Sequence, residues 1–175
     1  MPTSVASVDA ALPTEAPTDA GFLLGDDEAE PAPSEPTRLR MRVTAHTSDC
    51  PGYDVDLYPD GSVQFYGESG VNERGPKVAK VRPADALALY ERLLDSGFFR
   101  VKTLGPCDAH DPVWGEWAPS AQVSLVQQGV RRAQSFGPTS PCLQAPLREG
   151  IEAIERVAGI TQWLRCDYAG SCRDR

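Results

Sequence analysis

Four side chains in this sequence could together hold a metal ion. The chain of 175 residues has only two histidines, and each lies close to a cysteine. His46 stands four residues before Cys50, and His110 stands three residues after Cys107. Two imidazoles and two thiolates are a ligand set that a tetrahedral zinc ion takes. The sequence therefore allows a zinc site, the one cofactor that we consider, built from these four residues.

The same residues allow other uses. A cysteine beside a histidine can act as a nucleophile in a thiol-dependent enzyme, although no flanking sequence typical of such an enzyme accompanies either pair. The chain contains no P-loop, no G-x-G-x-x-G and no G-x-S-x-G sequence. We therefore favour a non-enzymatic role and assign no catalytic residue. The alternative is a metal- or thiol-dependent enzyme, or a zinc-stabilised domain, that uses these four residues.

The five cysteines also allow disulfides. Residues 120–126 and 130–136 alternate like two strands of a hairpin, and a hairpin brings its two open ends together. Cys107 precedes the first strand and Cys142 follows the second, so these two are candidates for a bridge. Cys166 and Cys172 could close a small loop near the C-terminus. The alternative is five unrelated thiols in a cytosolic protein.

The charges are distributed unevenly along the chain. Residues 1–37 hold eight of the 25 acidic residues and none of the 17 basic ones, so the net charge of −8 belongs to this segment. Six of the 16 prolines lie there too. Such a segment cannot bury enough apolar surface to offset its conformational entropy. The sequence predicts a disordered acidic tail over residues 1–37 and a single domain over residues 38–175.

This charge balance restricts the partners. A nucleic-acid-binding protein needs a basic surface, and the neutral body behind an acidic tail argues against that class. No apolar run is long enough for a transmembrane helix. An acidic, Pro-rich leader ahead of a domain is typical of the stalk of an exported protein or lipoprotein. We expect an extracytoplasmic location if an export signal was removed, and a cytoplasmic one otherwise. The oligomeric state is left open.

Hydrophobic periodicity predicts the elements. Strands are expected over residues 38–46 and 53–58, after an Asp60-Gly61 turn to about residue 67, and over residues 77–81. A helix runs from Pro83 to a stop at Gly97, with a broad apolar stripe along Leu87, Tyr90 and Leu94 and, beside them, Ala86, Leu89 and Leu93. The 120–136 hairpin and a helix from Pro146 to Gly159 follow. The order β-β-β-(β)-α-β-β-α predicts an α+β fold, a mostly antiparallel sheet of five to six strands with two helices packed on one face.

Residues 102–119 form a long predicted loop that carries Cys107, His110, Trp114 and Trp117. Loops of this length are often functional, and tryptophan is enriched at binding hot spots. Trp114, Trp117 and Tyr58 are therefore a candidate binding surface. The alternative is that both tryptophans anchor the loop to the core. The prediction that follows is a small interaction module that binds a protein or a cell-envelope component, with the tail as a spacer.

The motif order resembles a bacterial family of unknown function whose members open with C-x-x-x-C-P-x-Y and a D-G turn. The resemblance covers about residues 40–164, and the first cysteine of the family's pair falls at His46, which excludes a local disulfide with Cys50. It implies the fold given above and an exported or lipid-anchored protein, but no activity. The matching segments are Cys50-Pro51-Gly52-Tyr53, Asp60-Gly61, Gly67, Gly97-Phe98-Phe99, Pro146-Leu147 and Thr161-Gln162-Trp163.

Overall fold

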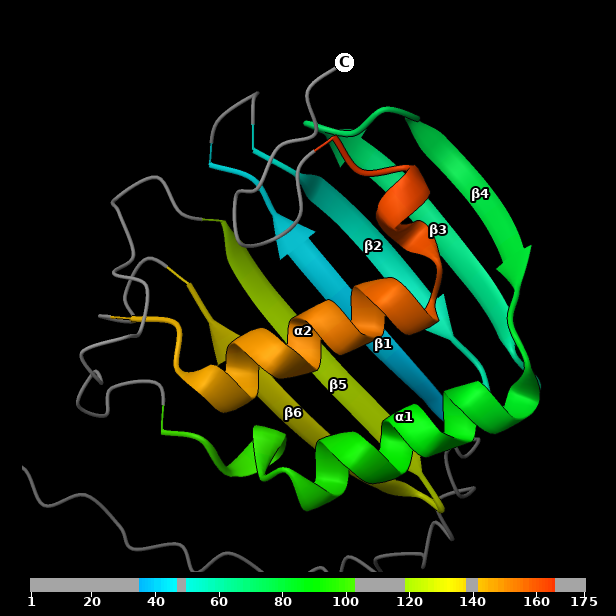
Figure 1. Cartoon of the computed structure of the whole chain (residues 1–175), viewed down its shortest axis with the longest axis vertical. Helices are drawn as coiled ribbons and strands as arrows, with labels where there is room; N and C mark the ends of the chain where they lie inside the picture. Colours follow the sequence, from blue (N-terminus) through cyan, green and yellow to red (C-terminus); the bar gives the residue numbers. More distant parts are fainter. Residues whose placement is uncertain (1–34, 47–49, 103–118, 138–141, 166–175) are drawn as a thin grey trace, which may run out of the picture. The chain divides into compact units, whose positions relative to one another are not determined.

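The described part of the chain forms a single antiparallel sheet with helices on one side. The computed structural model describes residues 35–46, 50–102, 119–137 and 142–165. Its strands, in the order β4-β3-β2-β1-β5-β6 across the sheet, are β1 (Arg38–Thr44), β2 (Gly52–Leu57), β3 (Ser62–Ser69), β4 (Gly75–Lys80), β5 (Ser120–Gln127) and β6 (Val130–Phe136). Helices α1 (Pro83–Asp95) and α2 (Ala145–Val157) both cross the same face (Figure 1). The predicted α+β class is confirmed.

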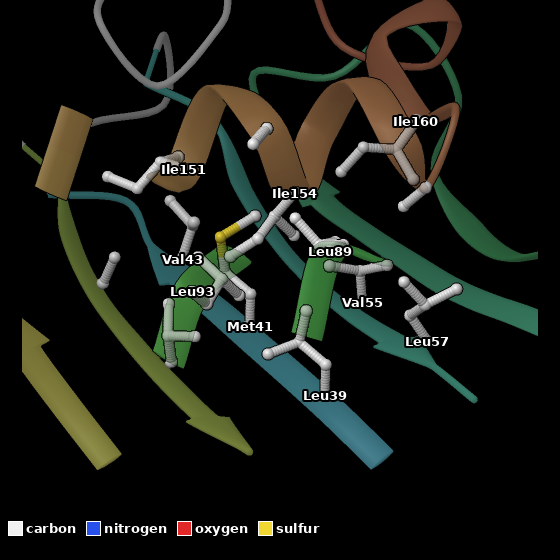
Figure 2. Packing of buried hydrophobic residues seen from close by; sticks show 14 of the residues in the cluster. Leu39, Met41, Val43, Val55, Leu57, Leu89, Leu93, Ile151, Ile154 and Ile160 are labelled. Carbon is white, nitrogen blue, oxygen red and sulfur yellow. The ribbon is translucent and has the colours of Figure 1, made fainter. Parts of the chain in front are cut away.

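The period-2 pattern of the strands decides which side chains meet the helices. Leu39, Met41 and Val43 alternate along β1 and are at most 1% exposed. They point toward α1 and α2, as do Val55 and Leu57 of β2 (Figure 2). Because successive strand residues face opposite sides, Arg40 and Arg42 must lie on the face that no described helix covers. We call this second side, defined by Arg40, Arg42, Asp54 and Asp56, the helix-free face.

Helix α1 begins and ends where the sequence predicts, and its buried stripe is narrower than the predicted one. Pro83 is at the start, and Gly97 follows in the left-handed conformation with φ of 78°. The predicted stripe was wrong at Leu87, which is 44% exposed. The residues that reach the core are spaced i, i+3, i+4 and i+7, the pattern of one helical face. They are Ala86, Leu89, Tyr90 and Leu93.

One polar contact ties this helix to the sheet. The hydroxyl of Tyr90 donates a hydrogen bond of 2.6 Å to the carbonyl oxygen of Leu57 at the end of β2. Burial of the ring raises the pKa of Tyr90 to about 12, because the phenolate would lose its hydration. A buried tyrosine usually finds such an acceptor. The phenol therefore stays neutral and fixes α1 against β2.

Two short 3-10 helices extend the helical layer. They are η1 (Phe98–Arg100), after α1, and η2 (Ile160–Gln162), after α2. Phe98 is fully buried, in edge-to-face contact with Phe99 and Phe136. Trp163, directly after η2, packs on Phe65 of β3 with ring centroids 5.0 Å apart. These aromatic contacts close the core at both ends of the helical layer.

Candidate functional site

The structure places half of the predicted zinc ligands. His46 is exposed, and its Nε2 lies 3.3 Å from the hydroxyl oxygen of Ser120. Cys50 is half-buried, and its carbonyl oxygen accepts a hydrogen bond of 3.3 Å from the Ser69 hydroxyl. Cys107 and His110 lie outside the described residues. Within the described ranges no group of three or more His, Cys, Asp or Glu side chains could hold a metal ion. The zinc site therefore stays a prediction.

The disulfide candidates are placed only in part. Cys142 is buried and disulfide-bonded, but no bridge between two cysteines falls wholly within the described residues. Cys107, Cys166 and Cys172 lie outside these residues. The predicted pairing of Cys107 with Cys142, and that of Cys166 with Cys172, are therefore still predictions.

The predicted aromatic surface is likewise incomplete. Trp114 and Trp117 lie outside the described residues. Tyr58 is half-buried and lines an open depression of about 650 Å³ at the β2–β3 turn. Its other lining residues are Thr37, Pro59, Asp60, Ser62 and Gln64. The binding surface of Tyr58, Trp114 and Trp117 therefore stays a prediction.

The helix-free face carries two arginine–carboxylate pairs that the sequence did not reveal. Arg40 of β1 bonds both carboxylate oxygens of Asp56 of β2, at 2.9 and 2.8 Å. Arg42 bonds both oxygens of Asp54, each at 2.7 Å. The strand register places these residues directly opposite each other, and the Asp54 carboxylate raises the pKa of Arg42 above its usual range. Both aspartates are thus engaged by arginines.

The two pairs differ in burial, which predicts a difference in stability. The side chain of Asp56 is 9% exposed, against 22% for Asp54. We expect Asp56→Asn to lower the free energy of unfolding by about 1–2 kcal/mol, because it removes the charge from a largely buried carboxylate that Arg40 binds. Asp54→Asn, the matched control, should cost less than about 1 kcal/mol, as exposed pairs do. Urea unfolding with unchanged m values measures both. Equal losses of stability in the two variants would contradict the inference that burial makes the Arg40–Asp56 pair the more important one.

A pocket opens on the helix-free face where β1, β5 and β6 lie side by side, and its wall also includes Ala121, Phe136 and Gly137. Its volume is about 400 Å³. The hydrogen-bonding side chains in its wall come from Arg42, Thr44, Ser120, Gln122 and Ser135. The register pairs Arg42 with Gln122 and Gln122 with Ser135, so these three form one row across the strands. The pocket joins a guanidinium, an amide and three hydroxyls, which can orient a polar ligand.

A buried acid in helix α2 was also missed from the sequence. Glu155 is 2% exposed, and one carboxylate oxygen accepts a hydrogen bond of 2.6 Å from the hydroxyl of Tyr53 on β2. Buried carboxylates are stable only when they are hydrogen-bonded. Glu155 lies four residues after Ile151 on the apolar face of the helix, and this position is the signal that could have revealed it. The contact joins α2 to the sheet.

One family model matches part of the chain, and that family has no assigned activity. Residues 37–113 match the model of a domain of unknown function, DUF6438. This confirms the resemblance to a family of unknown function. No curated protein matches the chain. The match includes β1 through η1, whereas β5, β6 and α2 follow it in the sequence. In the part of the chain that the structure describes, no helix is long and apolar enough to cross a membrane.

Proposed function

We propose that this chain is a non-enzymatic interaction module that binds a protein or a cell-envelope component outside the cytoplasm. The main support is the pocket of about 400 Å³ on the helix-free face. Binding sites are concave and carry a few convergent polar groups, and this pocket has both properties. The opposite face of the sheet is filled by the hydrophobic core, so a ligand of the sheet surface has to approach from the helix-free side.

Two further features support the proposal. The acidic segment 1–37 suits a spacer between an attachment point and the domain, because like charges and proline keep a chain extended. The pocket wall includes Ser120, the first residue of β5. The 102–119 segment, with Trp114 and Trp117, ends at this point of the sequence. A ligand in the pocket would therefore lie close to the connection that enters β5.

In-cell photocrosslinking tests the binding function for a ligand of any identity. Benzoylphenylalanine replaces Gln122, which is exposed in the pocket wall, or Glu152, which is exposed on α2 and serves as the matched control. We expect an adduct from position 122 but not from position 152. The added change Ser135→Tyr, which fills the pocket, should reduce that adduct several-fold. Equal yields from both positions, or none from position 122, would overturn the proposal.

Metal content separates this function from its enzymatic alternative. Purified full-length protein, prepared without chelator, is assayed for zinc and for thiols. About one zinc ion per chain, together with unfolding after chelation, would favour the site formed by His46, Cys50, Cys107 and His110. The binding function instead predicts that chelation leaves the photocrosslink at position 122 unchanged.

A further inference from the structure

Strand β6 is the last strand at one end of the described sheet (Figure 1). The turn before it has φ of 53° at Gln128 and 74° at Gly129, the positive values of a type I′ hairpin. Such a turn makes its closing pair, Gln127 and Val130, a hydrogen-bonded pair. Hydrogen-bonded and non-hydrogen-bonded pairs alternate along an antiparallel ladder. The N–H and C=O groups of Arg131, Ala133 and Ser135 therefore point away from β5.

Among the described residues, the opposite end of the sheet is protected against strand addition, whereas β6 is not. Along β4 the same alternation turns the backbone groups of residues 76, 78 and 80 away from β3. Residue 76 is Pro76, which has no N–H to offer, and residue 80 is Lys80. Proline and lysine on an edge strand prevent pairing with another strand. Strand β6 contains neither residue type, so its outward N–H and C=O groups can pair with an added strand.

Arginine side chains lie on β6 and beside it. Arg131 lies 3.9 Å from Glu35, but that carboxylate bonds Arg38 at 2.6 Å. Arg132 of β6 and Arg100 of η1 take part in none of the ion pairs within the described residues. Together with Leu94 and Phe99 they line a crevice of about 220 Å³ beside the strand. The crevice thus combines two apolar side chains with two guanidinium groups.

We propose that β6 binds an extended acidic segment of a partner protein, which adds to the sheet as a seventh strand. The inference rests on the proposed function as a binding module and names its partner. In strand addition, backbone hydrogen bonds give affinity and alternate side chains give specificity. One face of the added strand would meet Leu94, Phe99, Arg100 and Arg132, so it carries carboxylates beside apolar groups. A basic segment would be repelled by the arginines.

Peptide binding to the full-length protein tests this inference. The probe is a fluorescein-labelled nine-residue peptide in which every second residue is glutamate or valine in turn, with threonine between them, so that one face of the strand carries both. Its control has lysine in place of each glutamate. We expect the glutamate peptide to bind at least ten-fold more tightly. In amide exchange measured by NMR, the peptide should protect the N–H groups of Arg131, Ala133 and Ser135. The N–H groups of Arg132 and Gln134, which face β5, should already be protected without it.

Matched variants locate the interaction. Ala133→Pro removes an outward N–H without breaking the β5–β6 ladder, and we expect it to weaken binding at least ten-fold. Arg132→Glu reverses a charge in the crevice and should have a similar effect, which keeps the test decisive if the proline variant fails to fold. Lys80→Glu makes the same charge change on β4, at the other end of the sheet, and should leave binding unchanged.

Three outcomes would overturn the inference: equal binding of both peptides, binding that persists in both β6 variants, or a dimer of the chain that Ala133→Pro abolishes. The dimer would show that a second copy occupies β6. If the glutamate peptide does not bind while the photocrosslink from position 122 still forms, the inference fails and the proposed function stands. Loss of that crosslink, with peptide binding intact, would instead remove the pocket from the function.

Discussion

Replacing Gly61 by alanine should destabilise the domain by about 3–5 kcal/mol, the largest effect that we expect from a single added methyl group. Gly61 ends the β2–β3 turn with φ of +81°, a conformation that costs an L-residue about 1–2 kcal/mol. A Cβ at this position would also fall on the carbonyl oxygen of Val81. That carbonyl belongs to the backbone between β4 and α1, and Val81 N–H donates a 2.9 Å bond to Gly61, so relief requires backbone movement.

Gly75→Ala is the matched control for Gly61→Ala. Gly75 has φ of +82°, but a Cβ there would meet nothing within 4 Å. We expect a loss of about 1–2 kcal/mol, from backbone conformation alone. The difference between the two variants in urea unfolding then measures the clash with Val81. Equal losses would show that the turn and the β4–α1 connection are not in close contact.

Gly150→Ala should destabilise the domain by about 2 kcal/mol, although alanine is the better helix former. In an exposed helix this substitution stabilises by about 1 kcal/mol. Here the added Cβ would lie 2.6 Å from Cε2 of Phe98 and closer still to its Cδ2. The Phe98 ring is fully buried and held between Phe99 and Phe136. The ring cannot move away from the added methyl group without disturbing the core. The cost of overpacking therefore exceeds the gain in helix propensity.

A double-mutant cycle identifies the cause of that loss. Phe98→Leu alone should destabilise by creating a cavity. In the Gly150→Ala background the same change should cost at least about 1 kcal/mol less, because the methyl group occupies part of that space. Glu152→Ala, on the exposed side of α2, should change stability by less than about 0.5 kcal/mol. Additive losses in the cycle would contradict a clash between residues 98 and 150.

Local patterns predicted the elements because each pattern is short-range. The hairpin at Gln128-Gly129, the turn at Asp60-Gly61 and the helix starts near Pro83 and Pro146 depend on a few adjacent residues. Asp60 illustrates this: its carboxylate accepts bonds from the N–H and hydroxyl of Ser62 and from Lys80. These contacts, with the Lys80 bond first, lower the pKa of Asp60 to about 2. The exception was Leu87, because composition alone did not decide which apolar row of α1 meets the sheet.

The candidate site could not be predicted in the same way. Arg42, Gln122 and Ser135 form one row of the pocket wall, yet they come from three strands that span almost 100 residues. In the sequence, the arginines of β1 and the aspartates of β2 look only like the solvated positions of alternating strands. Their pairing requires β2 to lie beside β1 in one particular register. Glu155 was missed for a similar reason, since its partner Tyr53 is 102 positions away in the sequence.

The four candidate zinc ligands and the order of the strands show which properties depend on sequence and which depend on the tertiary structure. The sequence by itself determined their chemistry, the elements around them and the α+β class, because side-chain type and hydrophobic period are local properties. Only the tertiary structure decided that β1 lies at the centre between β2 and β5, and that β6 and β4 are the outermost strands of the sheet that the structure describes. Every strand has the same period of two, so periodicity cannot select partners. Packing of the buried faces against α1 and α2 selects them, and with them the pocket and the exposed strand.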